Sequence, residues 1–281
     1  MIRKLKRLAY TNLKARAGTS LVLVLVIVLA LFSGPWSLLL LVLTISVLAT
    51  SEYHRLILHL GYTPQRFIGQ TTGLLLIIAV WSILTRYNTI SILAALIPIP
   101  ALICFLELFR KKLTPVPNIA LTLLGVMWIS LPLAAFLCTG FIQAGILVYH
   151  PFIYLGYFLL LWSGDSGAYF AGMLAGKHPL LKRISPKKTI EGSAGGLIMV
   201  LLVAFINAML FGDLTLNQWL VLALIINLTG TLGDLAKSML KRSAGVKDSG
   251  TLLPGHGGIL DRFDSLIGSA PFVFLYLFLY A

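Results

Sequence analysis

The sequence predicts an all-α polytopic membrane protein of about nine transmembrane helices, with a cytoplasmic N-terminus and the C-terminus on the outer side. The first observation behind this prediction is composition: 58% of the 281 residues are apolar and only 11% are charged. A soluble globular chain carries about 25% charged residues. The mean hydropathy is also high, at +0.95. These values exclude a disordered chain, a coiled coil and an ordinary soluble enzyme.

The second observation is the set of apolar runs, because a spanning helix needs about 20 apolar residues. The tripeptide Ser33-Gly34-Pro35 interrupts the first long run. That run is therefore either one kinked helix or a tight hairpin of two helices. Counting it as two, we expect spans at about 17–33, 36–51, 67–85, 89–109, 116–138, 149–175, 190–211, 217–236 and 260–280.

The third observation is the distribution of basic residues, which favours two helices over one. With nine helices and the N-terminus inside, all of the 22 Lys and Arg residues except Arg86 lie on the cytoplasmic side. With eight helices, the basic N-terminal residues would face away from the others. The positive-inside rule therefore favours nine. The net charge of +13 is explained by loops that contact anionic lipid headgroups, so we expect the bilayer and no nucleic acid as a partner.

We divide the chain into an N-terminal region of five spans, residues 1–150, and a C-terminal catalytic region, residues 151–281. The basic N-terminal segment is expected to stay attached as a cytoplasmic segment, since it lacks a small-residue cleavage site. We find no internal repeat in the sequence. The odd helix count also argues against a simple duplicated transporter.

Acidic residues cluster with basic residues in two segments, 163–191 and 230–265. Charges at membrane depth are costly and usually mark function. Carboxylates beside Lys and Arg suit a divalent cation and phosphate groups. The alternative to a functional site is a purely structural role, in which Asp261 caps a helix and Asp234 forms a buried ion pair with Lys241. Helical spacing places the following residues on shared faces: Asp234 with Ser238, Lys241 and Arg242; Asp261 with Asp264 and Ser265; and Asp165 with Tyr169, Gly172 and Gly176.

The segment 247–258, Lys-Asp-Ser-Gly-Thr-Leu-Leu-Pro-Gly-His-Gly-Gly, is too rich in Gly and Pro for a helix, yet it lies between two predicted spans. Glycines let backbone N–H groups approach a phosphate closely. A Gly-Gly pair before a helix also places a phosphate at the positive end of the helix dipole. His256 is either a general acid or phosphate ligand, or a structural residue of the turn.

Residues 238–264 resemble the signature of the phosphatidate cytidylyltransferases, or CDP-diacylglycerol synthases: S-x-x-K-R, four residues, K-D-x-G, then L-P-G-H-G-G, two residues, and D-R-x-D. Two departures stand beside the motif. Lys237 occupies a position that is commonly acidic in that family, and Met173 one that is often basic. The N-terminal region is similar only in hydropathy and in Glu52 at the end of the second span. Further blocks in 163–268 extend the resemblance: Asp165-Ser-Gly-Ala-Tyr-Phe, Gly176-Lys-His, Ser185-Pro-Lys-Lys-Thr, Glu191-Gly and Gly233-Asp-Leu.

The resemblance implies transfer of CMP from CTP to phosphatidic acid, with Mg²⁺, giving CDP-diacylglycerol and pyrophosphate. It assigns Asp234, Asp261 and Asp264 to metal binding, in a one- or two-metal clamp in which a second cation could take part. The other expected site residues are Lys241, Arg242, Lys247 and Arg262 for phosphate; Ser238, Gly255, Gly257 and Gly258 as neutral donors; Asp248 and His256 within the signature; and Asp165, Lys187, Lys188 and Glu191 as a second wall.

The expected partners are thus CTP, phosphatidic acid and the bilayer, and a homodimer is compatible with the sequence. We expect a bacterial inner membrane, with the active site facing the cytoplasm. An isoprenoid or other acyl phosphate as the acceptor stays open. A transporter is disfavoured because the acids gather at one face. A CDP-alcohol phosphotransferase would need a longer aspartate array than Asp261-Arg-Phe-Asp264.

Overall fold

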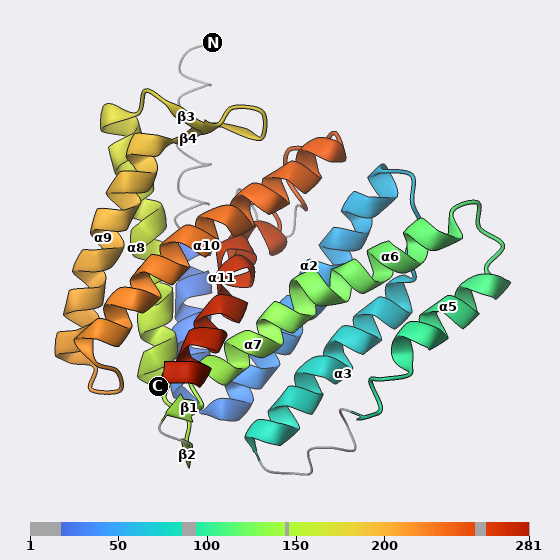
Figure 1. The fold of residues 1–281 in the computed structure, drawn as a ribbon, viewed down its shortest axis with the longest axis horizontal. Coiled ribbons are helices and arrows are strands. Elements are labelled where there is room, and N and C mark those ends of the chain that lie inside the picture. Colours follow the sequence, from blue (N-terminus) through green and yellow to red (C-terminus); the bar gives the residue numbers. More distant parts are fainter. Residues whose placement is uncertain (1–17, 86–93, 144–145, 251–256, 281) are drawn as a thin grey trace.

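The computed structural model describes residues 18–85, 94–143, 146–250 and 257–280. Within these ranges the chain is helical apart from two short antiparallel hairpins, β1–β2 and β3–β4 (Figure 1). The elements are the helix Gly18–Phe32, α2 (Pro35–His59), α3 (Arg66–Leu84), α5 (Ile99–Phe109), α6 (Pro115–Gly125), the π-helical turn η1 (Val126–Ser130), α7 (Leu131–Thr139), β1 (Ile142–Gln143), β2 (Ile146–Leu147), α8 (Pro151–Ala175), β3 (Pro179–Leu181), β4 (Ser185–Thr189), α9 (Ile190–Leu210), α10 (Leu216–Ser243) and α11 (Leu260–Tyr280).

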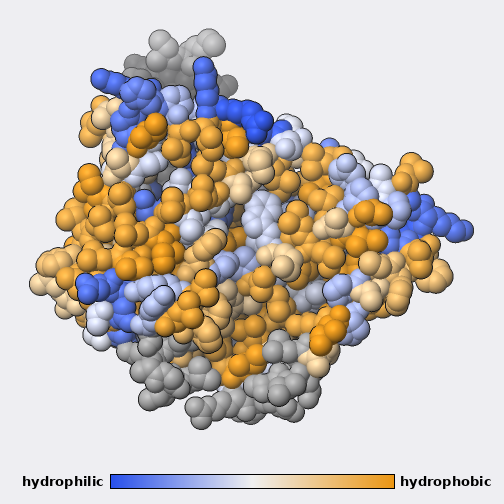
Figure 2. Space-filling view, in the orientation of Figure 1, coloured by the Kyte–Doolittle hydropathy of each residue, from blue (hydrophilic) through white to orange (hydrophobic). Residues whose placement is uncertain are grey.

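Six of these helices are long and apolar enough to cross a membrane: α2, α3, the continuous segment Pro115–Thr139, α9, α10 and α11. Large apolar side chains such as Leu40, Phe205 and Leu275 are exposed on them, and Figure 2 shows apolar surface across most of the visible face. A soluble protein would not expose so much apolar surface. The predicted class, an all-α integral membrane protein, is therefore confirmed.

The first apolar stretch breaks into two helices at Gly34, one of the two alternatives left open by the sequence. Gly34 has φ of 111°, a value that favours glycine. Pro35 then occupies the first turn of α2, where its missing N–H costs nothing.

The predicted span 116–138 is one segment, α6–η1–α7, that widens into a π-helical turn over Val126–Ser130. Pro132 follows that turn in the first turn of α7. A proline cannot donate to the carbonyl four residues earlier, here Trp128, so the regular α-helical ladder cannot run through this point.

Two helix pairs position the polar residues of the C-terminal region. Helix α8 packs on α9, and α10 contacts α8, α9 and α11. Helix α11 also packs on α7 and α2, which belong to the first 150 residues. One hydrophobic core contains residues of both regions, for example Tyr53 and Leu266. The division at residue 150 stays a prediction about organisation.

The β3–β4 hairpin was not expected from the sequence, and it joins α8 to α9. Pro179 pairs with Thr189, and Leu181 pairs with Ser185. Pro186 within the hairpin disfavours helix in the residue before it, which helps to keep this segment extended. The hairpin brings Lys187 and Lys188 to the end of the helices where α8 ends and α9 begins (Figure 1).

Candidate active site

The site is built where α10 and α11 approach each other closely. A Cβ added to Gly268 would lie 2.6 Å from Cα of Gly233, so only glycine fits at this crossing. Small residues allow such close contact between membrane helices. Asp234 and Lys237 of α10 consequently face the first turns of α11.

Lys237 lies at the centre of three carboxylates. Its ammonium nitrogen is 2.9 Å from Oδ1 of Asp234 and 3.3 Å from Oδ1 of Asp261, and it also contacts Oδ2 of Asp264. Lys237 is 5% exposed and Asp264 is 8% exposed. The three donors of an ammonium thus meet three carboxylates in a buried position.

Two further lysines flank this centre. Nζ of Lys188, from β4, is 2.5 Å from Oδ2 of Asp234. Nζ of Lys241, one turn after Lys237, is 2.6 Å from Oδ1 of Asp261. We call these six residues the aspartate cluster: Asp234, Asp261, Asp264, Lys188, Lys237 and Lys241.

The described ends of the Gly-rich segment are held by two carboxylates. Oδ2 of Asp261 accepts from the backbone N–H of Ser249 at 3.0 Å and of Gly258 at 3.3 Å. The Ser249 hydroxyl lies 2.9 Å from the same oxygen and 3.0 Å from Oε2 of Glu52. The segment is therefore tied to both α11 and α2.

Glu52, near the C-terminal end of α2, is fully buried and closes the start of α11. Its two oxygens accept from the backbone N–H groups of Ile259 and Leu260, each at 2.9 Å. The first N–H groups of a helix lack partners within the helix, and the helix dipole favours a negative charge there. A Cβ on Gly258 would lie 2.1 Å from Oε2 of Glu52, so this second glycine of the pair is needed for the contact.

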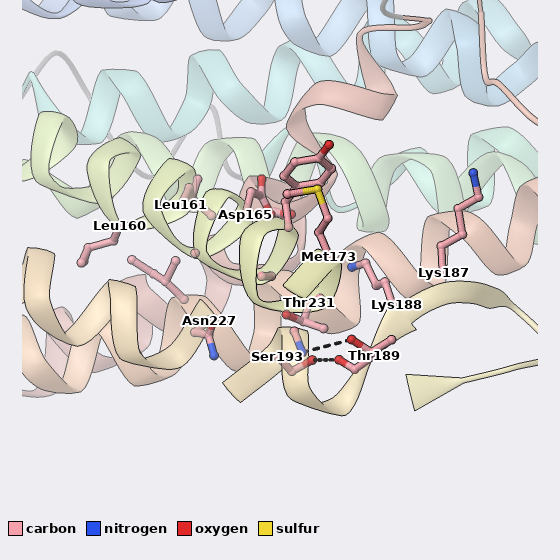
Figure 3. Close-up of a pocket in the computed structure, with 18 residues that line it drawn as sticks. Leu160, Leu161, Asp165, Met173, Lys187, Lys188, Thr189, Ser193, Asn227 and Thr231 are labelled. Atoms are coloured by element: carbon pink, nitrogen blue, oxygen red, sulfur yellow. Dashed lines mark hydrogen bonds between the residues drawn. The ribbon is translucent and has the colours of Figure 1, made fainter. Parts of the chain in front are cut away.

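A pocket of about 440 Å³ opens beside the aspartate cluster, between α8, α9 and α10. Leu160, Leu161 and Ile226 line it, as do Lys187 and Lys188. Figure 3 shows the leucines at one end of the pocket and the lysines at the other. A compound with an apolar tail and a phosphate group would match this gradient.

Asp165 also lines the pocket together with Tyr169 and Gly172 of its predicted helical face, whereas Gly176, the fourth residue predicted on that face, follows the end of α8 and is not among the lining residues. Its side chain is exposed. It lies within electrostatic reach of Lys188, Lys237 and Arg262. The second wall predicted from the sequence is thus placed next to the aspartate cluster for three of its four members, Asp165, Lys187 and Lys188.

The fourth member, Glu191, makes a different set of contacts. Its carboxylate lies 2.6 Å from Nδ1 of His178 and accepts from the backbone N–H groups of Lys177 and His178. These contacts fasten the start of the β3–β4 segment to the start of α9. Glu191 does not appear among the residues that line the pocket, and its assignment to substrate binding stays a prediction.

The remaining predicted residues differ in exposure. Ser238 is half-buried in α10, and Gly257 lies beside Asp261, where an added Cβ would be 3.0 Å from Oδ2. Gly255 and His256 lie outside the described residues. Four further predicted residues have exposed side chains: Arg242, Lys247, Asp248 and Arg262.

The predicted metal site differs from the arrangement in the structure. Each of the six carboxylate oxygens of Asp234, Asp261 and Asp264 already faces a lysine, a backbone N–H or a hydroxyl group. Among the described residues, no three His, Cys, Asp or Glu side chains form a group that could hold a metal ion. With Lys237 in this place, the three aspartates do not fit a metal ion held between them.

Sequence reasoning assigned no role at this site to two residues, Glu52 and Lys237. The sequence nevertheless contains a feature that could have identified each of them. Glu52 is an isolated acid in an apolar run, which is costly without a buried partner. Lys237 stands three residues after Asp234, a spacing at which helical side chains meet.

A family model described as the cytidylyltransferase family matches residues 14–280. The chain belongs to the cytidylyltransferase family.

Its relatives include named phosphatidate cytidylyltransferases. The chain is 46% identical to that of Haemophilus influenzae over 136 residues, which is 46% of this chain and 47% of the relative. It is 54% identical to that of Staphylococcus haemolyticus over 116 residues and 55% identical to that of Staphylococcus aureus over 117 residues, in both cases 41% of this chain and 44% of the relative. The match therefore spans less than half the length of these relatives.

Proposed function

We propose that the chain is an enzyme that transfers CMP from CTP to phosphatidic acid, forming CDP-diacylglycerol and pyrophosphate for phospholipid biosynthesis. The observation that carries the proposal is the pocket next to the aspartate cluster, which has Leu160 and Leu161 at one end and Lys187 and Lys188 at the other. Relatives named phosphatidate cytidylyltransferase support the same substrates.

The reaction needs no strong base, because the phosphate of the lipid is already ionised at neutral pH. One of its oxygens forms a bond to the α-phosphorus of CTP. The bond from that phosphorus to the oxygen bridging to the β-phosphate breaks, and pyrophosphate leaves with the electron pair. The protein must bring two anions together, so positioning and neutralisation of charge supply the catalysis.

The basic side chains divide this task. We propose that Lys187, Lys188 and Arg262 bind phosphate groups at the pocket, and that Arg242 and Lys247 attract the nucleotide from solution. Lys241 is engaged by Asp261 at 2.6 Å, so it holds the first turn of α11 in position. The leucines of the pocket would contact the acyl chains.

Mg²⁺ is the cofactor that we propose, because the family resemblance implies it. When bound, it would neutralise part of the triphosphate charge. The assignment of Asp234, Asp261 and Asp264 as its ligands remains a prediction, and the contacts of Lys237 with all three stand against it.

An assay of the purified full chain tests the proposal. The protein is incubated with labelled CTP, phosphatidic acid in mixed micelles and Mg²⁺. We expect a CMP-lipid with CTP or dCTP, no product with ATP or GTP, and none after addition of EDTA. Equal rates with ATP would contradict the proposal. Product from a polyisoprenyl phosphate but not from phosphatidic acid would show that the acceptor is an isoprenoid phosphate.

We also propose nine spans in a bacterial inner membrane, with the aspartate cluster on the cytoplasmic side and the C-terminus outside. The asymmetry of Lys and Arg supports this orientation.

In a chain without Cys104 and Cys138, single cysteines near Lys111, Lys182 and Ser249 should react with an impermeant thiol reagent only from the cytoplasmic side. One near Gly140 or Asp213 should react only from outside. Cytoplasmic labelling near Asp213 would rule out the nine-helix orientation.

A further inference from the structure

Lys237 lies where a cation between the three aspartates would lie. Its nitrogen is within 3.3 Å of oxygens of Asp234, Asp261 and Asp264. Since an ammonium has three N–H donors, these three carboxylates can take all of them. No donor then remains for a substrate phosphate. Lys237 is therefore a positioning residue, which acts through the carboxylates that it holds.

The charges of the cluster balance without a metal ion. Asp234, Asp261 and Asp264 supply three negative charges. Lys188, Lys237 and Lys241 supply three positive charges. If Lys237 were neutral, the buried group would carry one excess negative charge. Buried charges that lack partners are strongly disfavoured, so a cation from solution would then be attracted into the cluster.

A metal ion and the Lys237 ammonium exclude each other from this position. The lysine is 5% exposed, and Oδ1 of Asp261 already accepts from both Lys237 and Lys241. A divalent ion placed between the same oxygens would lie directly against a positive nitrogen, in surroundings with little water to screen the repulsion.

We propose that Lys237 is a tethered cation that takes the place of a metal ion between Asp234, Asp261 and Asp264, so that the only metal the reaction needs is the Mg²⁺ that CTP brings with it. The part of this inference that concerns the reaction rests on the proposed function. The part that concerns the cluster rests on the contacts of Lys237 alone.

The test of the cluster uses Mn²⁺ as the probe, because its paramagnetic resonance distinguishes free from bound ion. The full chain is placed in nanodiscs of phosphatidylcholine, which carry no net charge, without nucleotide. Lys237→Met removes the ammonium and frees three carboxylates, and Lys237→Glu adds a fourth. We expect both variants to bind Mn²⁺ at least tenfold more tightly than the unchanged chain.

The matched control is Lys112→Glu, which makes the same charge change at an exposed position in the segment between α5 and α6. This control should bind Mn²⁺ no more tightly than the unchanged chain. Thermal unfolding of each variant shows whether it is folded, and Lys237→Met decides the question if Lys237→Glu does not fold. Equal Mn²⁺ binding by the unchanged chain and the folded Lys237 variants would overturn the proposal.

A second measurement follows the reaction at a constant concentration of the Mg–CTP complex while free Mg²⁺ is raised. The rate of the unchanged chain should vary less than twofold. The rate of Lys237→Glu should rise at least fivefold, since its cluster must first bind a cation. A fivefold rise in the unchanged chain would overturn the requirement for a single Mg²⁺. If the unchanged chain forms no CMP-lipid, the proposed function fails, while the Mn²⁺ measurement still decides the role of Lys237.

Discussion

In the part of the chain that the structure describes, a buried carboxylate of the N-terminal region and the aspartate cluster differ in what surrounds them. In the N-terminal region, Glu107 accepts from the amides of Gln65 and Asn118, at 2.6 and 2.9 Å, and pairs with Arg110 at 2.8 Å. In the C-terminal region, three carboxylates share three lysines, and the group borders a pocket.

The difference distinguishes a network that is complete by itself from the proposed active site. Around Glu107, neutral amides and one arginine satisfy a single charge and join α3, α5 and α6. Such a network needs nothing from outside the protein. The aspartate cluster concentrates charge of both signs beside a pocket lined by Lys187 and Asp165. Burial of a carboxylate therefore does not by itself mark an active site, whereas charges of both signs beside a cavity make the aspartate cluster the candidate.

The largest expected effect is that of Asp261→Asn. The asparagine keeps one acceptor oxygen but loses the charge that holds Lys241 and Lys237, and its NH₂ group would face donors. We expect turnover to fall on the order of 10³-fold, as for loss of an electrostatic group in an active site. Steady-state assays of the folded variant measure this.

The matched control for that substitution is Asp213→Asn. Asp213 pairs with His150 at 2.7 Å, in the turn between α9 and α10, at the other end of α9 from Lys188. Turnover of this control should stay within twofold of the unchanged chain. If Asp261→Asn folds normally and stays active, the role of Asp261 is only to cap the helix, for which asparagine is as good as aspartate.

The next effect is that of Gly268→Ala, which tests whether the aspartate cluster depends on the close crossing of α10 and α11. The added methyl group would lie 2.6 Å from Cα of Gly233, so the helices must separate. A shift of about 1 Å in an active site can cost about 10²-fold in rate. Stability should fall by about 1–3 kcal/mol. Gly212→Ala, where nothing lies within 4 Å of the added atom, is the control and should change neither rate nor melting temperature.

A smaller effect is expected for Glu52→Gln, at a residue of the N-terminal region that contacts the start of α11 beside the aspartate cluster. Glutamine has one acceptor oxygen, while Glu52 accepts from both Ile259 and Leu260. The start of α11 should shift, and kcat should fall about 10- to 100-fold. The KM for CTP should change much less, because both carboxylate oxygens are already taken by backbone N–H groups of the protein. A change in KM alone would contradict this positioning role.

The smallest effect on activity is expected for Glu107→Gln, the same substitution in the other buried group. Its amide would face Gln65, Asn118 or Arg110 as a donor against donors. The unfolding free energy should fall by about 1–3 kcal/mol. Turnover per folded molecule should stay within twofold. Thermal unfolding and turnover measured together decide this, and a tenfold loss of turnover in the folded variant would remove the distinction between the two groups.

Several helices follow closely from the sequence, because a lipid-facing helix must be apolar along its whole length. The predicted span 89–109 is an exception: it begins in residues outside those described, and α5 covers only Ile99–Phe109. The predicted runs 190–211 and 260–280 correspond to α9 (Ile190–Leu210) and α11 (Leu260–Tyr280). The β3–β4 hairpin was missed because its strands are short and lie in a polar segment without periodicity.

The charged residues that gather in the proposed active site were also largely predictable, because few charges occur between apolar runs. Asp234, Asp261, Asp264 and Lys241 do meet. The relation of Lys237 to them was not predictable from helical spacing. Spacing shows that Lys237 can reach Asp234, but not that α11 brings two more carboxylates to the same nitrogen.

The membrane class, most helix bounds, the family and most of the charged residues of the proposed site can be predicted from the sequence alone, since these depend on local composition and on a continuous motif. Tertiary structure alone decided which charges neutralise which. Glu52 meets Leu260 across 208 positions of the chain, and Lys237 meets Asp264 across 27. An apolar helix presents several similar faces, so its sequence does not specify which neighbour each face meets. The crossing at Gly233 and Gly268 fixes that choice, and with it places a lysine between the three aspartates.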